Sequence, residues 1–491
     1  MENFLILFSI VSIATLAFIT RILKDRRPKQ DLPPGPKPWP IIGNLNLLGS
    51  IPHQSLHHLS QKYGEIMLLK FGKFPVVIAS SPEMARQFLK VHDAVFASRP
   101  ALAAGKYTAY NYSDMTWAPY GPYWRQARKI FFSEVFNAKR LEFYERIRVE
   151  ERRNFLSRLG SLSGEPVGLR DHLYCYTQST ICRMIIGDKY MSKSDELQEM
   201  VDEWFLLNGV FNIGDWIPWL SFFDLQGYVK KMKALHKKLD SFHNFVIEDH
   251  LAGRAAENDV VHALLQMVDD PNLGVQLTRD CVKALIQDLL VGGTDTSATI
   301  VEWAVHEILR QPRIVEKAKE ELDRVIGRKR WVEENDFPSH LPYIDAIVME
   351  TCRLHPVGTL LGPHYATQDC NVAGYNISKG TTVLINAWSI GRDPDSWAEP
   401  EAFLPERFVG KETDMLGSNF GLLPFGSGRR RCPGHNLGLK LVRTTLANLL
   451  HGFELKLVED VSMEEEYGLT THPKHPLNII MKPTLPPYLY S

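Results

Sequence analysis

The spacing of apolar residues changes along the chain from a two-residue period to a helical one, and this change predicts a mainly α fold with a minor β part. Apolar positions alternate from Glu65 to Ala79 and predict two short strands that turn at Gly72-Lys73. From residue 120 to about 350, apolar residues recur at helical spacing, as in the stretch from Ile314 to Ile326. Strand-like sequence returns between Pro363 and Leu384.

Local signals mark the ends of elements and the extent of the domain. Ser81 and Pro82 are typical of a helix start, and a last helix is expected just after Cys432, through Leu437 and Leu446. After residue 36 the chain has no internal repeat, low-complexity tract or linker-like composition. Residues 37–491 are therefore expected to form one large domain.

The first twenty residues have the character of a membrane-spanning helix. Residues 3–20 carry no charge, and a helix of that length reaches about 27 Å at about 1.5 Å per residue. Glu2 precedes this segment and a basic cluster follows it, at Arg21, Lys24, Arg26, Arg27 and Lys29. The positive-inside rule then predicts a transmembrane anchor over residues 1–20 with the rest of the chain in the cytosol.

A cleaved signal peptide is the alternative for this segment. It requires basic residues before the apolar stretch and a small-residue cleavage site after it. Here the basic cluster stands on the other side and no A-x-A site is present. Residues 21–36, which end in Pro33-Pro34-Gly35-Pro36, are expected to be a basic, proline-rich hinge.

Composition narrows the possible functions. The 491 residues include 56 basic and 57 acidic ones, so the chain has no general preference for nucleic acids. Its six cysteines form no CxxC pair, which argues against a disulfide scaffold and against zinc.

A glycine-rich loop, F-G-S-G-R-R-R-C-P-G at residues 425–434, delivers one cysteine to the start of the last predicted helix. The helix dipole and free backbone N–H groups are expected to lower the pKa of Cys432, and a thiolate is the axial haem ligand that favours O–O cleavage. One alternative is a nucleotide loop, but Arg431 stands where its third glycine is required. The other is a buried structural cysteine, which leaves three consecutive arginines unexplained.

Phe425, Gly428, Arg430, Cys432 and Gly434 match the signature FxxGxRxCxG, and the chain resembles the cytochrome P450 superfamily, in particular its plant A-type microsomal group. The resemblance implies a cytochrome P450 fold preceded by one N-terminal transmembrane helix. It implies haem b (iron protoporphyrin IX) as cofactor, with Cys432 as the iron ligand. It also implies a single-pass protein of the endoplasmic reticulum membrane with a cytosolic catalytic domain.

The predicted helix from Leu289 to Trp303 contains two glycines that each cost about 1 kcal/mol relative to alanine. Gly292 and Gly293 are expected to make room for a flat cofactor, and the Thr296 hydroxyl can bond the Gly292 carbonyl. By itself this pattern also fits a capped helix break. The resemblance implies that Thr296 and Asp295 deliver protons for dioxygen cleavage.

The other site residues follow from the resemblance. Glu350 and Arg353 share a helix face and alone would form an ordinary surface ion pair; the family adds Arg407 and gives the trio a structural role near the cysteine loop. Trp124 and Arg128 also share a helix face, which is either a solvated surface or a haem propionate site. The expected cofactor-binding residues are Trp124, Arg128, His364, Arg430, Phe425 and Gly434.

Residues 355–362 depart from the proline-rich run that is usual in the family at this point. By analogy with the family, this stretch lines the substrate pocket together with residues 106–117, 205–219 and 467–471.

The resemblance implies a monooxygenase that inserts one atom of O2 into an apolar plant metabolite, either a terpenoid or a phenylpropanoid or flavonoid. The sequence has no nicotinamide or flavin fingerprint, so electrons are expected from NADPH through cytochrome P450 reductase, with cytochrome b5 as a second candidate donor. A basic patch for this partner would consist of Arg125, Lys129, Arg429, Arg431 and Lys440. The alternatives are a haem-thiolate isomerase or dehydratase, a haem sensor or carrier, and oxidative C–C cleavage of a terpenoid alcohol.

Overall fold

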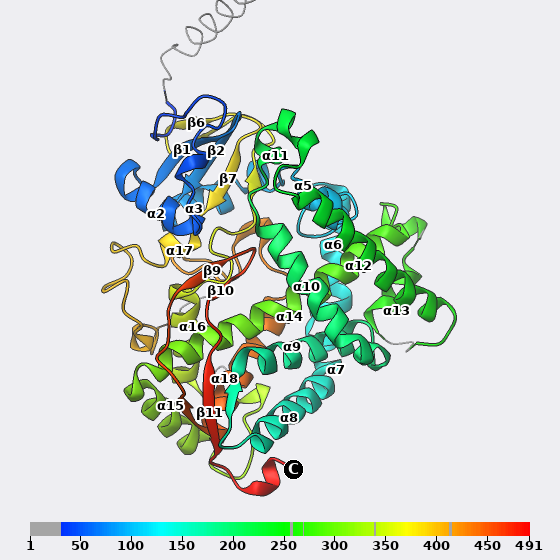
Figure 1. The fold of residues 1–491 in the computed structure, drawn as a ribbon, viewed down its shortest axis with the longest axis vertical. Helices are drawn as coiled ribbons and strands as arrows, with labels where there is room; N and C mark the ends of the chain where they lie inside the picture. Colours follow the sequence, from blue (N-terminus) through cyan, green and yellow to red (C-terminus); the bar gives the residue numbers. More distant parts are fainter. Residues whose placement is uncertain (1–30, 256–258, 269, 338–339, 412–414) are drawn as a thin grey trace, which may run out of the picture.

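The computed structural model describes residues 31–255, 259–268, 270–337, 340–411 and 415–491, and within them helices predominate (Figure 1). The helices are α2 (Pro52–Tyr63), α3 (Pro82–Arg86), α4 (Asp93–Phe96), α5 (Ala103–Thr108), α6 (Pro122–Phe131), α7 (Ala138–Phe143), α8 (Glu145–Ser161), α9 (Leu169–Ile185), α10 (Ser194–Gly209), α11 (Ile213–Trp216), α12 (Tyr228–Leu251), α13 (Val260–Gln266), α14 (Arg279–Leu309), α15 (Pro312–Val325), α16 (Pro342–Leu354), α17 (Ala387–Ile390) and α18 (His435–Gly452).

The strands form small separate sheets. They are β1 (Ile66–Phe71), β2 (Phe74–Ala79), β3 (Pro166–Gly168), β4 (His364–Tyr365), β5 (Cys370–Val372), β6 (Tyr375–Ile377), β7 (Thr382–Ile385), β8 (Phe453–Leu457), β9 (Glu465–Tyr467), β10 (Thr471–Pro473) and β11 (Asn478–Pro483). The largest sheet has the order β1-β2-β7-β4. The predicted mainly α class with a minor β part is confirmed.

The sheet joins two segments that are far apart in the sequence. β1 and β2 form the predicted hairpin, with Ile66 opposite Ala79, and β2 pairs in parallel with β7, with Val76 opposite Thr382. The helix after the hairpin begins as expected, because the Ser81 hydroxyl accepts the backbone N–H of Met84 at 3.2 Å. This sheet therefore brings the segment after α16 against the N-terminal part of the chain.

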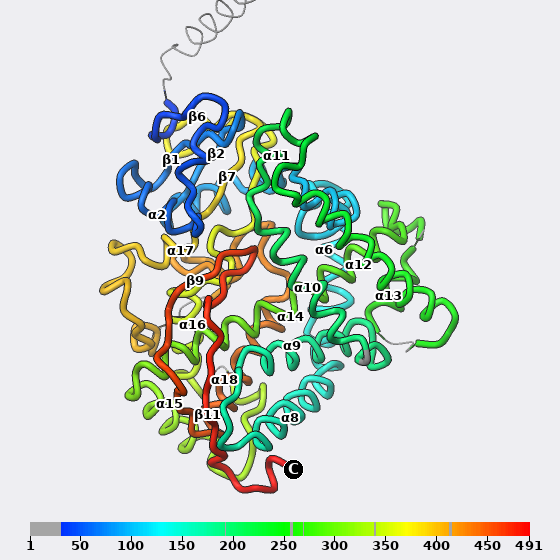
Figure 2. Tube along the Cα trace, in the orientation of Figure 1, coloured from blue at the N-terminus to red at the C-terminus, as the bar shows by residue number. Residues whose placement is uncertain are grey.

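The helix α14 runs through the middle of the molecule beside α9, α16 and α18 (Figures 1 and 2). Most of its side chains are buried, including Leu285, Val301 and Trp303. A helix that is apolar on nearly all sides is typical of the core of a large domain. Consequently, α14 can serve as one wall of an internal cavity.

The hairpin of β9 and β10 packs beside α14, and the sequence analysis did not predict it. Tyr467 lies opposite Thr471 in this hairpin. The Trp303 indole donates to the Thr471 carbonyl at 3.1 Å, which joins β10 to the central helix.

The predicted anchor, residues 1–20, lies outside the described residues, as does most of the predicted hinge. Within the described ranges, no helix combines the length and apolar character needed to cross a membrane. The carbonyl of Pro34 accepts the backbone N–H of Leu68 at 2.8 Å, so the end of the proline-rich segment is docked on β1.

Candidate active site

A cavity of about 490 Å³ lies between the loop that carries Cys432 and the middle of α14. Phe425, Cys432 and Gly434 line one side, and Gly292 and Thr296 line the other. The volume is typical of a small-molecule or cofactor site. The cavity therefore joins the two segments that the sequence singled out.

The cysteine loop is shaped by backbone contacts. The carbonyl of Phe425 accepts the Cys432 N–H at 2.9 Å. Gly428 has φ +69°, and a Cβ there would lie 2.2 Å from the Leu89 carbonyl oxygen. A side chain at this position would thus be excluded both by the backbone conformation and by the neighbouring chain.

The expected fall in the pKa of Cys432 is not found. Burial raises the pKa of this thiol, and the Gly434 N–H and the charges of Arg128 and Arg431 oppose that rise only in part. Burial is the main cause, and the helix adds little because α18 begins at His435, so that Cys432 lies outside its first turn. The protein environment alone favours the thiol, so bound metal would supply the driving force for the thiolate.

The α14 wall has the geometry that its glycines predicted. A Cβ at Gly292 would meet nothing within 4 Å, because this position faces the cavity, whereas one at Gly293 would lie 2.5 Å from Ile181. The Thr296 hydroxyl donates to the Gly292 carbonyl at 2.8 Å, as predicted. The alternative of a helix break is wrong, because α14 continues without interruption from Arg279 to Leu309.

Asp295 lies on a different face of α14 from Thr296. Thr296 lines the cavity and Asp295 does not; the Asp295 carboxylate is buried and faces His472 of β10. Thr296 and Asp295, the two predicted proton-delivery residues, therefore make no direct side-chain contact.

Arg430 is a partly buried cation at the edge of the cavity. Its guanidinium donates to the carbonyls of Ala97 at 2.6 Å, Met115 at 3.1 Å and Ala118, and it lies 4.4 Å from the centre of the Trp124 ring. Burial, together with the charge of Arg99, lowers the pKa of Arg430 to about 8. Carbonyl groups alone are poor compensation for a buried positive charge.

Arg99 is a second partly buried cation at this edge, and the sequence analysis missed it. It donates to the carbonyls of Thr116, Gly362 and Pro363 at 2.7 to 2.9 Å, and burial lowers its pKa to about 10. The available signal was its position as the lone charged residue between Asp93 and Lys106.

Three other predicted cofactor-binding residues stand at the same edge of the cavity. The Trp124 indole donates to the Met115 carbonyl at 3.1 Å, and Arg128 donates to the Arg431 carbonyl at 2.8 Å. His364 is buried, with Nδ1 2.9 Å from the Phe96 carbonyl. Burial and the charge of Arg99 lower the pKa of His364 to about 3, so the ring is neutral.

The donor set fits haem. Haem is a flat apolar ring with two carboxylates at one edge, and this cavity has an apolar body with partly buried cations at one side. The guanidinium groups of Arg99 and Arg430 have carbonyl partners but no carboxylate partner within ion-pair distance among the described residues. Two propionates would compensate their charge, and Cys432, which lines the same cavity, would supply the thiolate ligand.

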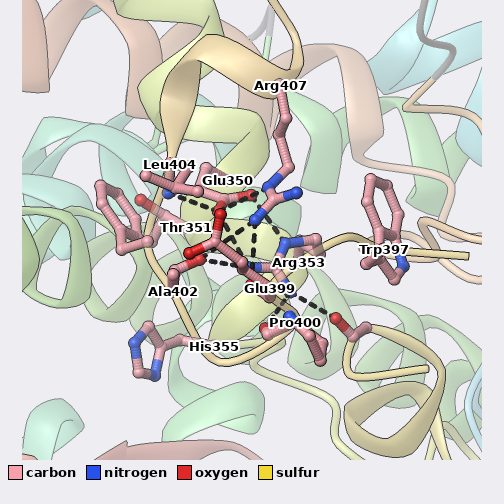
Figure 3. Close-up of polar contacts among 12 residues, drawn as sticks. Glu350, Thr351, Arg353, His355, Trp397, Glu399, Pro400, Ala402, Leu404 and Arg407 are labelled. Carbon is pink, nitrogen blue, oxygen red and sulfur yellow. Dashed lines mark hydrogen bonds and ion pairs between the residues drawn. The ribbon is translucent and has the colours of Figure 1, made fainter. Parts of the chain in front are cut away.

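The structure also brings Glu350, Arg353 and Arg407 together, as Figure 3 shows. The Glu350 carboxylate accepts two hydrogen bonds from Arg353, at 2.7 and 2.8 Å, and one from Arg407 at 3.0 Å. Arg353 also donates to the carbonyls of Pro400 and Ala402. The trio therefore joins α16 to the segment that leads into the cysteine loop.

The four stretches expected to line the substrate pocket all contribute residues to the wall of this cavity. They are Met115, Thr116 and Trp117; Phe205, Asn208 to Phe211, Asp215 and Trp216; Val357 to Gly362; and Tyr467 to Thr470. Asp288 of α14 is a further lining residue that the sequence analysis missed. Its carboxylate accepts the Met115 N–H and the Thr116 hydroxyl, and so ties one wall to α14.

The family model described as Cytochrome P450 matches residues 33–482. A solved zebra fish cytochrome P450 with progesterone is 26% identical, has a TM-score of 0.76, and the match covers 88% of this chain and 99% of that one. The chain belongs to the cytochrome P450 family, and it is a monooxygenase of the oxidoreductase class with haem iron as its cofactor.

Plant relatives indicate to which group of the cytochrome P450 family this chain belongs. Trimethyltridecatetraene synthase of Zea mays is 44% identical, covering 95% of this chain and 91% of the relative. Flavonoid 3'-monooxygenase of Petunia hybrida is 42% identical, covering 99% of both chains. This protein is a plant A-type P450 that oxidises small molecules of secondary metabolism, and P450 monooxygenases generally use O2 and a redox partner.

Proposed function

We propose that this enzyme inserts one atom of O2 into an apolar terpenoid or flavonoid-type metabolite, using electrons that NADPH-cytochrome P450 reductase delivers. The observation that carries the proposal is the cavity that lies between Cys432 and Thr296. Bound haem b would supply dioxygen activation there, with Cys432 as the iron ligand. For each dioxygen, the reaction takes up two electrons and two protons, and it releases one water and the oxidised substrate.

The polar side chains of the cavity wall are largely engaged with the protein itself, which favours an apolar substrate. The Asn208 carbonyl oxygen accepts the Trp117 indole N–H at 2.8 Å and the Thr108 hydroxyl at 3.2 Å, and its amide donates to Trp204. The hydroxyls of Thr359 and Thr471 lie 3.3 Å apart. The surface left for a ligand is mainly carbon, and burying it in this pocket is favourable by about 25 cal/mol per Å².

The names of the relatives support two substrate classes. Two relatives are named for hydroxylation of flavonoids, and two Zea mays relatives are named as synthases of the polyenes trimethyltridecatetraene and dimethylnonatriene. The second pair favours a second candidate function, the oxidative C–C cleavage of a terpenoid alcohol.

The residues around the cavity take separate roles in this proposal. Arg99, Arg128 and Arg430 bind the propionates, and His364 contributes a neutral ring beside them. The Trp124 indole donates its N–H to the Met115 carbonyl and therefore positions Arg430, which lies over its ring. Phe425 and Gly434 pack next to the cysteine. Thr296 holds a proton donor on the α14 side, and Glu350 with its two arginines keeps the cysteine loop in place.

The predicted reductase patch needs one correction. Lys440 pairs with the buried carboxylate of Glu334 at 2.7 Å, and Arg429 pairs with Asp93 at 2.7 Å, so both charges are partly compensated within the protein. Arg125 and Lys129 are exposed one turn apart on α6, and we place the centre of the docking surface there. The double variant Arg125→Glu/Lys129→Glu should slow reduction and weaken its salt dependence, whereas Lys237→Glu on α12 should not.

Membrane association is part of the proposal. Large apolar side chains are exposed beside the start of the described chain: Trp39, Ile41, Trp219, Phe222, Phe223 and Leu225. Backbone contacts of Gly72 with Ile42 and Trp216 bring their segments together. An exposed patch of this kind fits an anchored protein that rests on a membrane surface. We propose residues 1–20 as anchor, 21–36 as connecting segment and 37–491 as the catalytic domain, on the cytosolic side of the endoplasmic reticulum.

The N-glycosylation sequons at Asn111 and Asn376 test this topology, because both asparagines are exposed and would be glycosylated in the lumen.

The activity is tested by reconstituting the protein with the reductase and feeding a panel of terpenoids and flavonoids. Oxidised products that require NADPH support monooxygenation, and NADPH-independent turnover supports an isomerase. A reduced, carbon monoxide-treated protein without the red-shifted Soret band of thiolate ligation would refute the proposal.

A further inference from the structure

Behind the cavity wall, the buried Asp295 faces a histidine from the C-terminal hairpin. The distance from Asp295 Oδ2 to His472 Nε2 is 3.4 Å, and the side chains are 6% and 25% exposed. Oδ2 accepts no formed hydrogen bond from the described residues. The carboxylate is thus within ion-pair distance of the imidazole and still has a lone pair free for a proton.

Neighbouring hydroxyls fix the orientation of the imidazole. The Thr299 hydroxyl donates to the Asp295 carbonyl at 3.0 Å, so its oxygen accepts from His472 Nδ1 at 3.1 Å. His472 Nε2 lies 2.8 Å from the Thr470 hydroxyl. A neutral ring can accept a hydrogen bond from Thr470 at Nε2, and a charged ring can donate from Nε2 toward Asp295. The ring can therefore gain and lose a proton without turning.

The surrounding charges favour the protonated ring. Burial opposes the imidazolium, but the Asp295 carboxylate outweighs it and raises the pKa of His472. The other titratable and charged groups around this pair come from every element packed against it: Glu302 on α14, Arg170 and Tyr174 on α9, Asp202 on α10, and Glu466, which is opposite His472 on β9. Glu302 and Arg170 pair with each other at 2.8 Å, which leaves Asp295 as the dominant partner.

We propose that His472 is the positioning residue through which solvent protons reach Asp295 on their way to the Thr296 side of the cavity. This inference rests on the proposed monooxygenase function. The imidazolium gives its Nε2 proton to Asp295 Oδ2 and becomes neutral, with Nδ1–H still bonded to Thr299. Nε2 is then the one basic atom of the ring, and it takes up the next proton from solvent. The protonated Asp295 side chain then turns about its Cα–Cβ bond, gives the proton to a water molecule on the Thr296 side of α14, and returns to the carboxylate. Each dioxygen requires two such transfers, and no electrons move in this step.

Burial explains why a relay is needed. Asp295 is only 4% exposed, so bulk water has little direct access to its carboxylate. His472 is the partly exposed group that contacts it, and the contact is made by a side chain from a different element. The arrangement differs from an ordinary structural ion pair because it connects a buried acid to the surface.

The kinetic test compares His472→Gln with the control His475→Gln. His475 lies in the same segment, is 61% exposed and faces Glu464 at 3.8 Å. Product formation by the wild-type holoenzyme should fall as pH rises through the His472 pKa, because the relay then loses its proton. His472→Gln should lower turnover by about tenfold or more, flatten this pH profile and enlarge the solvent deuterium isotope effect, while His475→Gln keeps the wild-type profile.

A second measurement does not depend on turnover. Histidine Cε1 NMR titration of the diamagnetic, ferrous carbon monoxide form of the holoenzyme identifies His472 by the signal that His472→Gln removes. Its pKa should lie above the usual histidine value and should fall in Asp295→Asn. An unchanged His472 pKa in Asp295→Asn, or a wild-type pH profile in His472→Gln, would overturn the relay. If either result is found while the Soret band of a thiolate ligand and the NADPH-dependent products remain, only the relay is refuted. The proposed monooxygenase function is then retained.

Discussion

Arg353 donates two hydrogen bonds to Glu350, and neither side chain has any exposed surface. The distance from Arg353 Nε to Glu350 Oε2 is 2.7 Å. The same spacing of three residues and the same 2.7 Å contact occur between Glu83 and Arg86, whose side chains are 50% and 42% exposed. The chain therefore contains one ion-pair geometry in two environments.

This comparison predicts very different costs for the same substitution. Glu350→Gln should lower the free energy of unfolding by about 3 to 5 kcal/mol, because it leaves two buried guanidinium groups without their carboxylate. Glu83→Gln should change it by less than about 1 kcal/mol. Chemical denaturation followed by far-UV circular dichroism measures both, and equal effects would contradict the assigned role of Glu350.

The partly buried cations at the cavity edge predict that haem retention depends on Arg430. Arg430→Leu should release haem to an acceptor protein at least about tenfold faster, since removing one partner of a buried charge pair costs about 2 kcal/mol or more. Arg430→Lys should have a smaller effect, and Arg429→Leu, at the exposed neighbouring position, should retain haem as the wild type does. Unchanged haem release from Arg430→Leu would mean that this guanidinium does not meet a propionate.

Two threonines of α14 offer a matched test of the cavity wall. Thr296 and Thr294 both donate to the carbonyl four residues earlier, at 2.8 and 2.6 Å, but Thr296 lines the cavity and Thr294 does not. Thr296→Ala should lower the yield of product per NADPH by about tenfold, with release of hydrogen peroxide, because the wall loses its proton donor. Thr294→Ala should keep the wild-type yield of product per NADPH. Equal yields of product per NADPH in both variants would show that Thr296 takes no part in proton delivery.

Glu465 predicts how stability depends on pH. Burial opposes its charge, but hydrogen bonds from His53 and Trp388 and the charge of Arg392 outweigh burial and lower the pKa of Glu465 to about 2. A lowered pKa stabilises the folded state above the ordinary value of 4.5, and this contribution disappears as pH falls from there toward 2.

Glu465→Gln should therefore be less stable than the wild type near neutral pH, by an amount on the order of 3 kcal/mol. The difference should shrink as the solution is acidified below about pH 4.5. The adjacent Glu464, which is 61% exposed, provides the control, and Glu464→Gln should show no comparable loss. A gap between Glu465→Gln and the wild type that stays constant on acidification would be inconsistent with this assignment.

The parts of the fold that sequence predicted are those with strong local signals. The hairpin of β1 and β2 has regular alternation and a turn at Gly72-Lys73, and the helix after it has Ser81 as a cap. The cysteine loop was predictable because Gly428 and the helix that follows Cys432 leave a dense local pattern. In each case, neighbouring residues determine the structure.

The hairpin of β9 and β10 had no such signal, because its strands contain three residues each and are largely polar. Contacts from elsewhere stabilise it, including the Thr471 N–H to the Val357 carbonyl at 2.9 Å. The pairing of Asp295 with His472 depends on this docking and could not be seen in either local sequence. The prediction that the pKa of Cys432 is lowered was wrong for a related reason. Burial of the thiol by segments distant in the sequence raises its pKa more than the local effect of the helix lowers it.

The docking of the β9 and β10 hairpin on α14 also sets an order for assembly during synthesis. Tyr467, Leu469 and Thr470 complete the cavity wall, yet the ribosome adds them long after Trp124 and the whole of α14. The nascent chain therefore has an open, apolar groove at this side until residues 467–470 have been synthesised. Haem must therefore enter either before the hairpin of β9 and β10 docks on α14 or after the groove opens again.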